Sequence, residues 1–70
     1  MSEFKRGDRV EWNFRGGKVV GVVKRKLTAR TAIGGRAVAA SKDDPRYLLR
    51  IEGSGKEVAH RPEALRRAPR

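Results

Sequence analysis

Seventy residues are enough for one domain, and 18 Lys and Arg against 8 Asp and Glu give it a formal charge of +10 at pH 7. The chain has no cysteine, which excludes disulfides, thiolate zinc sites and a thiolate nucleophile. The N-terminal residues lead directly into polar sequence and all apolar runs are short. We therefore expect no signal peptide, no membrane insertion and a cytoplasmic location.

Short segments rich in β-branched residues, separated by glycine and proline, predict an all-β chain. In chain order, the alternation of apolar and polar residues predicts strands near residues 8–14, 18–27, 31–40, 46–52 and 56–60. A helical turn is expected at 62–65, because Pro62 suits the first position of a helix. Within the second strand, Gly21 predicts a bulge or a sharp bend.

The third segment has two interpretations. Gly34 and Gly35 either form a two-residue hairpin turn, with 31–33 and 36–40 as its arms, or lie in a loop before a strand of residues 37–40. With either interpretation, five short strands joined by small loops predict a small, partly open β-barrel. We expect a single domain over residues 1–70, ordered over 4–66, with a frayed tail at 67–70.

One face of the predicted strands carries the apolar residues of the expected core. These are Val10, Trp12, Val19, Val23, Leu27, Val38, Leu49, Ile51 and Val58. Because Trp12 shares its face with Val10, we expect it to stabilise the fold more than to bind a ligand.

The chain resembles a known family over about residues 4 to 66. The matching residues are Phe4 to Asn13, Gly21, 23–28, Ile33, Gly35, Val38, Ala40 and Ser41, 43–49, and 59–65. They resemble the Tudor-type domain named after hypervirulence-associated proteins. This resemblance implies a five-stranded SH3/Tudor-like barrel, and a binding module more than any particular activity.

Few residues suit catalysis. His60 is the only histidine, and Asp43 and Asp44 precede Pro45, where carboxylates are typical of a turn. The short glycine clusters lack the following helix that would cradle a phosphate. We therefore expect no enzyme, no catalytic residue, no metal site and no cofactor.

Four aromatic residues provide one candidate site. Tudor-type barrels often bind a methylated cation in an aromatic cage, for which the candidates here are Phe4, Trp12, Phe14 and Tyr47. Packing is favoured over a cage, since the strand pattern places Trp12 and Tyr47 on apolar faces and a basic domain repels a basic tail.

Basic residues provide the other candidate site, because no acidic residue occurs from Val19 to Lys42. The predicted nucleic-acid-binding residues are Lys24, Lys26, Arg30, Arg36, Arg66 and Arg67. Alternation places Lys24 and Lys26 on one face with Val20 and Val22. We expect a weak, sequence-tolerant nucleic-acid-binding module. The alternatives are an adaptor that uses Val20 and Val22 or binds an acidic protein, a module for nucleotide or dinucleotide phosphates, and a solvated charged surface without a ligand.

Overall fold

The computed structural model describes residues 4–68, which form an all-β chain, as predicted. Its elements are β1 (Arg9–Phe14), β2 (Gly17–Leu27), β3 (Thr31–Ile33), β4 (Arg36–Val38), β5 (Arg46–Ile51), β6 (Glu57–His60), the 3₁₀ turn η1 (Pro62–Ala64) and β7 (Arg66–Arg67). No helix within this part of the chain has the length and apolar character needed to cross a membrane.

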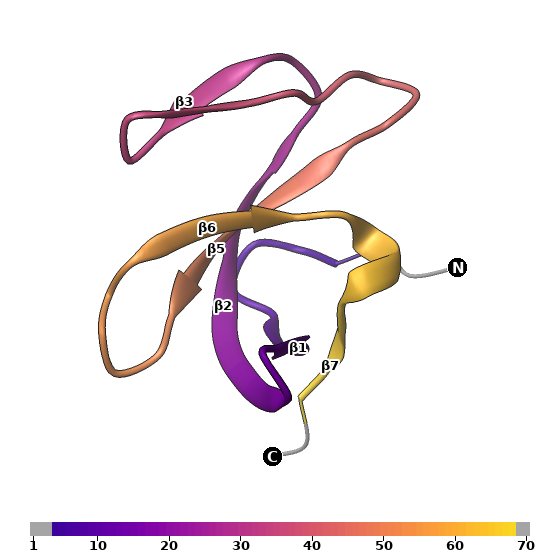
Figure 1. The fold of residues 1–70 in the computed structure, drawn as a ribbon. Helices are drawn as coiled ribbons and strands as arrows, with labels where there is room; N and C mark the ends of the chain where they lie inside the picture. Colours follow the sequence, from indigo (N-terminus) through magenta and orange to yellow (C-terminus); the bar gives the residue numbers. More distant parts are fainter. Residues whose placement is uncertain (1–3, 69–70) are drawn as a thin grey trace.

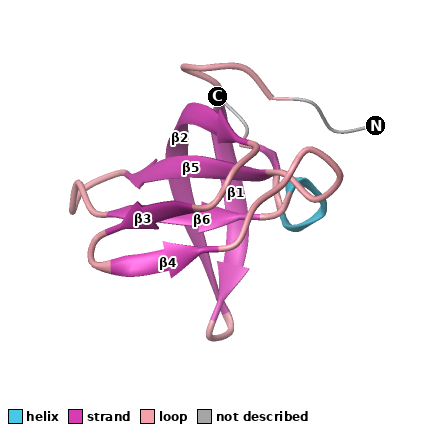
Figure 2. Ribbon diagram, turned by 90° about the horizontal axis from the view of Figure 1, so that it is seen from above, coloured by secondary structure: helices cyan, strands magenta, loops and turns pink. Residues whose placement is uncertain are grey.

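Instead of the expected five-stranded, partly open barrel, the strands form two separate sheets. A five-stranded antiparallel sheet has the order β6-β5-β2-β1-β7, and β3 pairs only with β4. Of the two interpretations of Gly34 and Gly35, the structure has the hairpin, with a second arm two residues shorter than expected. Both glycines have positive φ angles (56° and 81°), as a tight two-residue turn requires. This turn pairs the short arms with each other, so the segment 31–40 adds no strand to the main sheet. The β3–β4 hairpin instead lies beside β6 (Figures 1 and 2).

The fifth strand of the main sheet comes from the C-terminal segment. Val10 pairs with Arg67 and Glu11 with Arg66, and the Ala68 amide donates to the Arg9 carbonyl oxygen at 3.0 Å. The prediction of a frayed tail is therefore wrong at residues 67 and 68, because the edge of β1 provides hydrogen-bonding groups for them. The remainder of that predicted tail, residues 69–70, lies outside the described residues.

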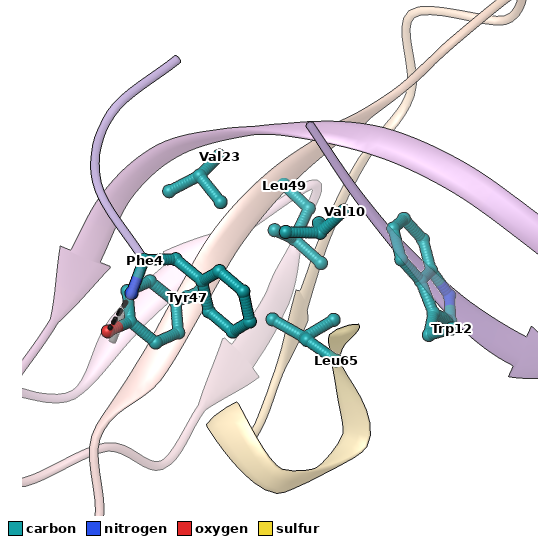
Figure 3. Close-up of a cluster of buried hydrophobic side chains, with 7 residues drawn as sticks. All are labelled: Phe4, Val10, Trp12, Val23, Tyr47, Leu49 and Leu65. Carbon is teal, nitrogen blue, oxygen red and sulfur yellow. Dashed lines mark hydrogen bonds between the residues drawn. The ribbon is translucent and has the colours of Figure 1, made fainter. Parts of the chain in front are cut away.

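The core lies on one face of the five-stranded sheet (Figure 3). It consists of Phe4, Val10, Trp12, Val23, Tyr47, Leu49 and Leu65, with Val19, Ile51 and Val58 partly buried against it. Phe4 and Tyr47 meet edge to face at 5.6 Å between ring centroids, and the Phe4 amide donates to the Tyr47 hydroxyl. The expected core is largely confirmed. Phe4, Tyr47, Leu48 and Leu65 are also buried, although they were not among the expected core residues.

A register shift in β2 explains where the core prediction fails. Val23 pairs with Leu49 but Arg25 pairs with Leu48, so one extra residue of β2 lies between these two pairs. Beyond this bulge the alternation is reversed, and Leu27 is buried outside the central cluster instead of in it. Val38 is only half-buried, because it belongs to the hairpin.

Gly21 has a different role from the one predicted, because the register shift falls after it, between Val23 and Arg25. A Cβ at Gly21 would lie 2.6 Å from the Arg50 carbonyl oxygen and 2.9 Å from Cη2 of Trp12. Glycine therefore allows the indole ring to pack directly on the backbone of β2.

Candidate functional site

A basic pocket runs along the second half of β2. Its charged lining residues are Arg6, Lys24, Arg25, Lys26 and Glu57, and its apolar lining residues are Phe4, Val23, Ala32, Ile33 and Leu48. Four cations thus line a space of about 750 Å³ together with a single carboxylate. An excess of positive charge around a concave surface attracts anions more strongly than the same charges dispersed over the molecule.

The structure brings together only two of the six predicted nucleic-acid-binding residues. Lys24 and Lys26 line the basic pocket, whereas Arg30 is exposed in the loop after β2. Arg66 and Arg67 lie in β7, where they are 3.7 Å from the Glu11 carboxylate and 3.2 Å from the Asp8 carboxylate, respectively.

The last predicted residue, Arg36, lines a different, apolar pocket. The structure therefore does not bring these four residues into the basic pocket. Strand pairing, and not proximity in sequence, decides which cations share a surface.

Sequence reasoning missed two cations of this pocket, Arg6 and Arg25. Alternation favoured Lys24 and Lys26 over Arg25, but the bulge interrupts that alternation. Nothing in the sequence marks Arg6, because the chain before β1 shows no strand pattern. The run Lys24-Arg25-Lys26 was the available signal, and all three of its residues line the pocket.

Ion pairing divides these cations into two groups. Lys24 donates to the Glu57 carboxylate at 2.6 Å, and this hydrogen bond, with the nearby charges of Arg50 and Arg25, lowers the pKa of Glu57. Within residues 4–68, Arg25 has no ion pair of its own. An arriving phosphate has to compete with Glu57 for Lys24, whereas Arg25 can turn toward it without losing a partner.

The four aromatic residues do not form a cage. Phe4, Trp12 and Tyr47 are buried in the core at 8%, 4% and 1% exposure, while Phe14 is 55% exposed. Packing is therefore the role of three of the four rings. Phe14 at the end of β1 is the exception, as the exposed large hydrophobic side chain of the described residues.

Phe14 borders an apolar pocket between the main sheet and the β3–β4 hairpin. The apolar lining residues of this pocket are Trp12, Phe14, Val19, Ile33, Ala37, Val38, Ile51, Val58 and Ala59, with Gly34, Arg36, Glu57 and His60 completing it. Its volume of about 450 Å³ falls within the roughly 300–1,000 Å³ of small-ligand sites. The His60 and Trp12 rings lie 5.1 Å apart, and burial lowers the pKa of His60, which favours its neutral form.

A strained turn holds a cation over the Phe14 ring. Phe14 pairs with Gly17, so Arg15 and Gly16 form the two-residue turn between β1 and β2. Both central residues have positive φ (51° and 78°), which is rare for arginine. The Arg15 guanidinium carbon lies 5.2 Å from the Phe14 ring centroid, within cation–π range.

Val20 and Val22 do not form the exposed apolar strip expected for an adaptor. Both are half-buried, and they pair with Glu11 and Arg9. Arg9 donates to the Glu52 carboxylate at 2.6 Å, a bond that lowers the pKa of Glu52 and raises that of Arg9. Charged side chains therefore lie beside Val20 and Val22, and charged residues are depleted in the buried centre of protein interfaces.

Comparison with known proteins agrees with this architecture. Residues 7–65 match the model of the family described as the TUDOR domain of hypervirulence-associated proteins. No curated protein and no solved structure matches the chain. The matched segment extends from the turn before β1 to the residue after η1. It includes the main sheet except β7, the hairpin, the apolar pocket, and the basic pocket except Phe4 and Arg6. This chain belongs to the TUDOR domain family of hypervirulence-associated proteins.

Proposed function

We propose that this Tudor-type domain is a non-enzymatic binding module for nucleic acid, which it binds weakly and with little base preference. The observation that carries the proposal is the basic pocket, where Arg6, Lys24, Arg25 and Lys26 surround one carboxylate. The net charge of +10 adds a long-range attraction for any polyanion.

The predicted selectivity follows from the chemistry of these side chains. Lysine and arginine bind phosphate oxygens, which are the same for every base, so contacts of this kind carry no sequence code. Neutralising phosphates releases counterions, and the logarithm of affinity should fall with the logarithm of salt concentration by about 0.7–0.9 per contact. A pocket lined by four cations accommodates only a few phosphates, hence the expected weak affinity.

Fluorescence anisotropy with a labelled single strand and a labelled duplex, at low and moderate salt, tests this function. We expect binding that weakens steeply with salt for strands of every sequence. Arg25→Glu should reduce the affinity for all of them, because it reverses a charge in the pocket without breaking an ion pair of the described residues.

The matched control is Lys42→Glu, which changes the net charge by the same amount in the loop before β5. Lys42 lines neither the basic nor the apolar pocket. Equal losses for the two variants would mean that only overall charge matters. The absence of binding by the unmodified protein at low salt would contradict the proposed function.

A further inference from the structure

We propose that the nucleic acid is single-stranded and that one of its bases occupies the apolar pocket while neighbouring phosphates contact the basic pocket. This inference rests on the proposed function and adds the strand type and the position of the base. The apolar pocket lies between Trp12, Phe14 and His60 on one side and the β3–β4 hairpin on the other.

The two pockets are adjacent, which is the first observation behind this inference. Ile33 at the end of β3 and Glu57 at the start of β6 line both of them. A ligand that extends from one pocket into the other must therefore be anionic at one end and apolar at the other. A nucleotide within a strand has this character, since its phosphate is charged and its base presents two apolar faces.

The lining of the apolar pocket suits a flat aromatic ring. Phe14 presents a largely exposed ring, at 55% exposure, at the pocket's edge, and the Trp12 and His60 rings contact each other within its wall. Single-strand-binding proteins stack bases on such side chains whatever the base, because every base has a π face. This mode of contact agrees with binding that is tolerant of sequence.

Charge complementarity extends to the rim of the apolar pocket. Arg15 lies over the Phe14 ring at 5.2 Å, and Arg36 lines the pocket from β4. Neither residue has an ion pair within residues 4–68. An apolar peptide offers these cations no opposite charge. A nucleotide within a strand does, because its sugar carries a phosphate on each side.

Duplex nucleic acid does not meet the same requirements. Its bases are stacked and paired inside the helix, and extruding one into a pocket carries an energetic cost that a single strand avoids. A duplex can still contact the basic pocket through its phosphates. We therefore expect both forms to bind, with the single strand binding more tightly.

Three short fluorescent ligands of equal length test the inference. They are oligothymidylate, a strand with the same sugar–phosphate backbone but no bases, and a duplex. Anisotropy titrations at low salt should give an affinity for oligothymidylate roughly ten-fold above that for the abasic strand, as expected for one base–aromatic stack. Oligothymidylate, unlike the abasic strand, should also quench the fluorescence of Trp12, the single tryptophan of the chain.

The variant Phe14→Ala should lose roughly the same ten-fold for oligothymidylate and nothing for the abasic strand. The fold should tolerate this change because the ring is exposed, and a melting curve checks this. Arg15→Asn provides a control that removes the rim cation and keeps the turn, since asparagine adopts positive φ readily.

The possible outcomes separate the two proposals. Equal affinity for oligothymidylate and the abasic strand, or an unchanged Phe14→Ala variant, overturns the base-binding inference and leaves phosphate binding in place. The apolar pocket would then belong to another occupant, such as a peptide side chain. Failure of all three ligands to bind overturns the proposed function itself.

Discussion

Every residue of the central core comes from the five-stranded sheet, the segment before β1 or the residue after η1, and none comes from the β3–β4 hairpin. Residues 31–38 are half-buried or exposed throughout, whereas Val10, Val23, Tyr47 and Leu49 are at most 1% exposed. The hairpin contacts the sheet through β3 and β6. An isolated two-stranded hairpin is only marginally stable in water, so its position depends on this contact.

The two regions contribute differently to the stability of the domain, although the core residues Phe4 and Trp12 also line the pockets. The sheet buries the apolar surface that stabilises a domain this small, while the hairpin contributes Ile33 to both pockets. The hairpin forms one wall of the apolar pocket and has few buried side chains, and local opening of such a segment costs less free energy than opening of the core.

The largest expected effect is the difference in stability loss between Trp12→Ala in the sheet and Val38→Ala in the hairpin. Removing a buried aromatic side chain typically costs about 3–5 kcal/mol, a large part of the total stability of such a domain. Truncating the half-buried Val38 should cost only about 1 kcal/mol, since little apolar surface is lost. Denaturant unfolding followed by circular dichroism measures both values. Similar losses for the two variants would show that the hairpin is part of the same core.

A smaller effect is expected at Gly21, where the indole ring packs on the backbone. Gly21→Ala introduces a Cβ within 2.6 Å of a backbone oxygen, which cannot move aside easily. We expect a loss of about 1–3 kcal/mol, as for other overpacked sites.

Gly17→Ala in the same strand is the matched control for Gly21→Ala. Its Cβ would come no closer than 3.7 Å to another residue beyond its chain neighbours, and its φ angle is not positive. This variant should be as stable as the parent or slightly more stable, because alanine reduces the entropy of the unfolded chain. Equal destabilisation of the two variants would mean that the close contacts of a Cβ at Gly21 with Arg50 and Trp12 are not the cause.

The sequence predicts the main sheet better than the hairpin because only the sheet leaves a periodic pattern. Alternation located β1, β2, β5 and β6 to within a few residues of their observed bounds. The arms of the hairpin are three residues each, too short for a pattern to decide which strand they pair with. β7 consists of two arginines, whose pairing with β1 depends on tertiary structure alone.

The candidate sites were harder to predict than the fold, for a related reason. The bulge near Lys24 leaves no mark in the sequence, yet it changes which cations line the basic pocket and places Leu27 outside the central cluster. Ion pairs such as Arg67 with Asp8 join residues 59 positions apart, so a run of basic residues does not show which charges are compensated. The apolar pocket combines residues from β1, β4 and β6, and only the arrangement of the two regions brings them together.

The smallest expected effect concerns His60, which lies where the two regions meet. Burial lowers the pKa of His60 below its ordinary value of 6.5, so the folded chain binds a proton there less readily than the unfolded chain does. As the pH falls below about 6.5, the unfolded state takes up this proton first, and the free energy of unfolding must decrease. The stabilisation is present above the ordinary pKa and is lost progressively until the pH reaches the pKa of the folded protein.

Thermal melts between about pH 8 and about pH 5 measure this change in the unmodified chain and in His60→Gln, which has no proton to bind in this range. The unmodified protein should lose stability toward pH 5, while the variant should show a nearly flat profile. Asp8, Glu52 and Glu57 also have lowered pKa values, because of hydrogen bonds from the Lys5 amide, Arg9 and Lys24, respectively. Their ordinary values are 3.8 for aspartate and 4.5 for glutamate, so their contribution is lost only in more acidic solution. If the stability of His60→Gln falls as steeply with pH as that of the parent, another group causes the change. His60, at the boundary between the sheet and the hairpin, would then not determine the pH dependence of stability.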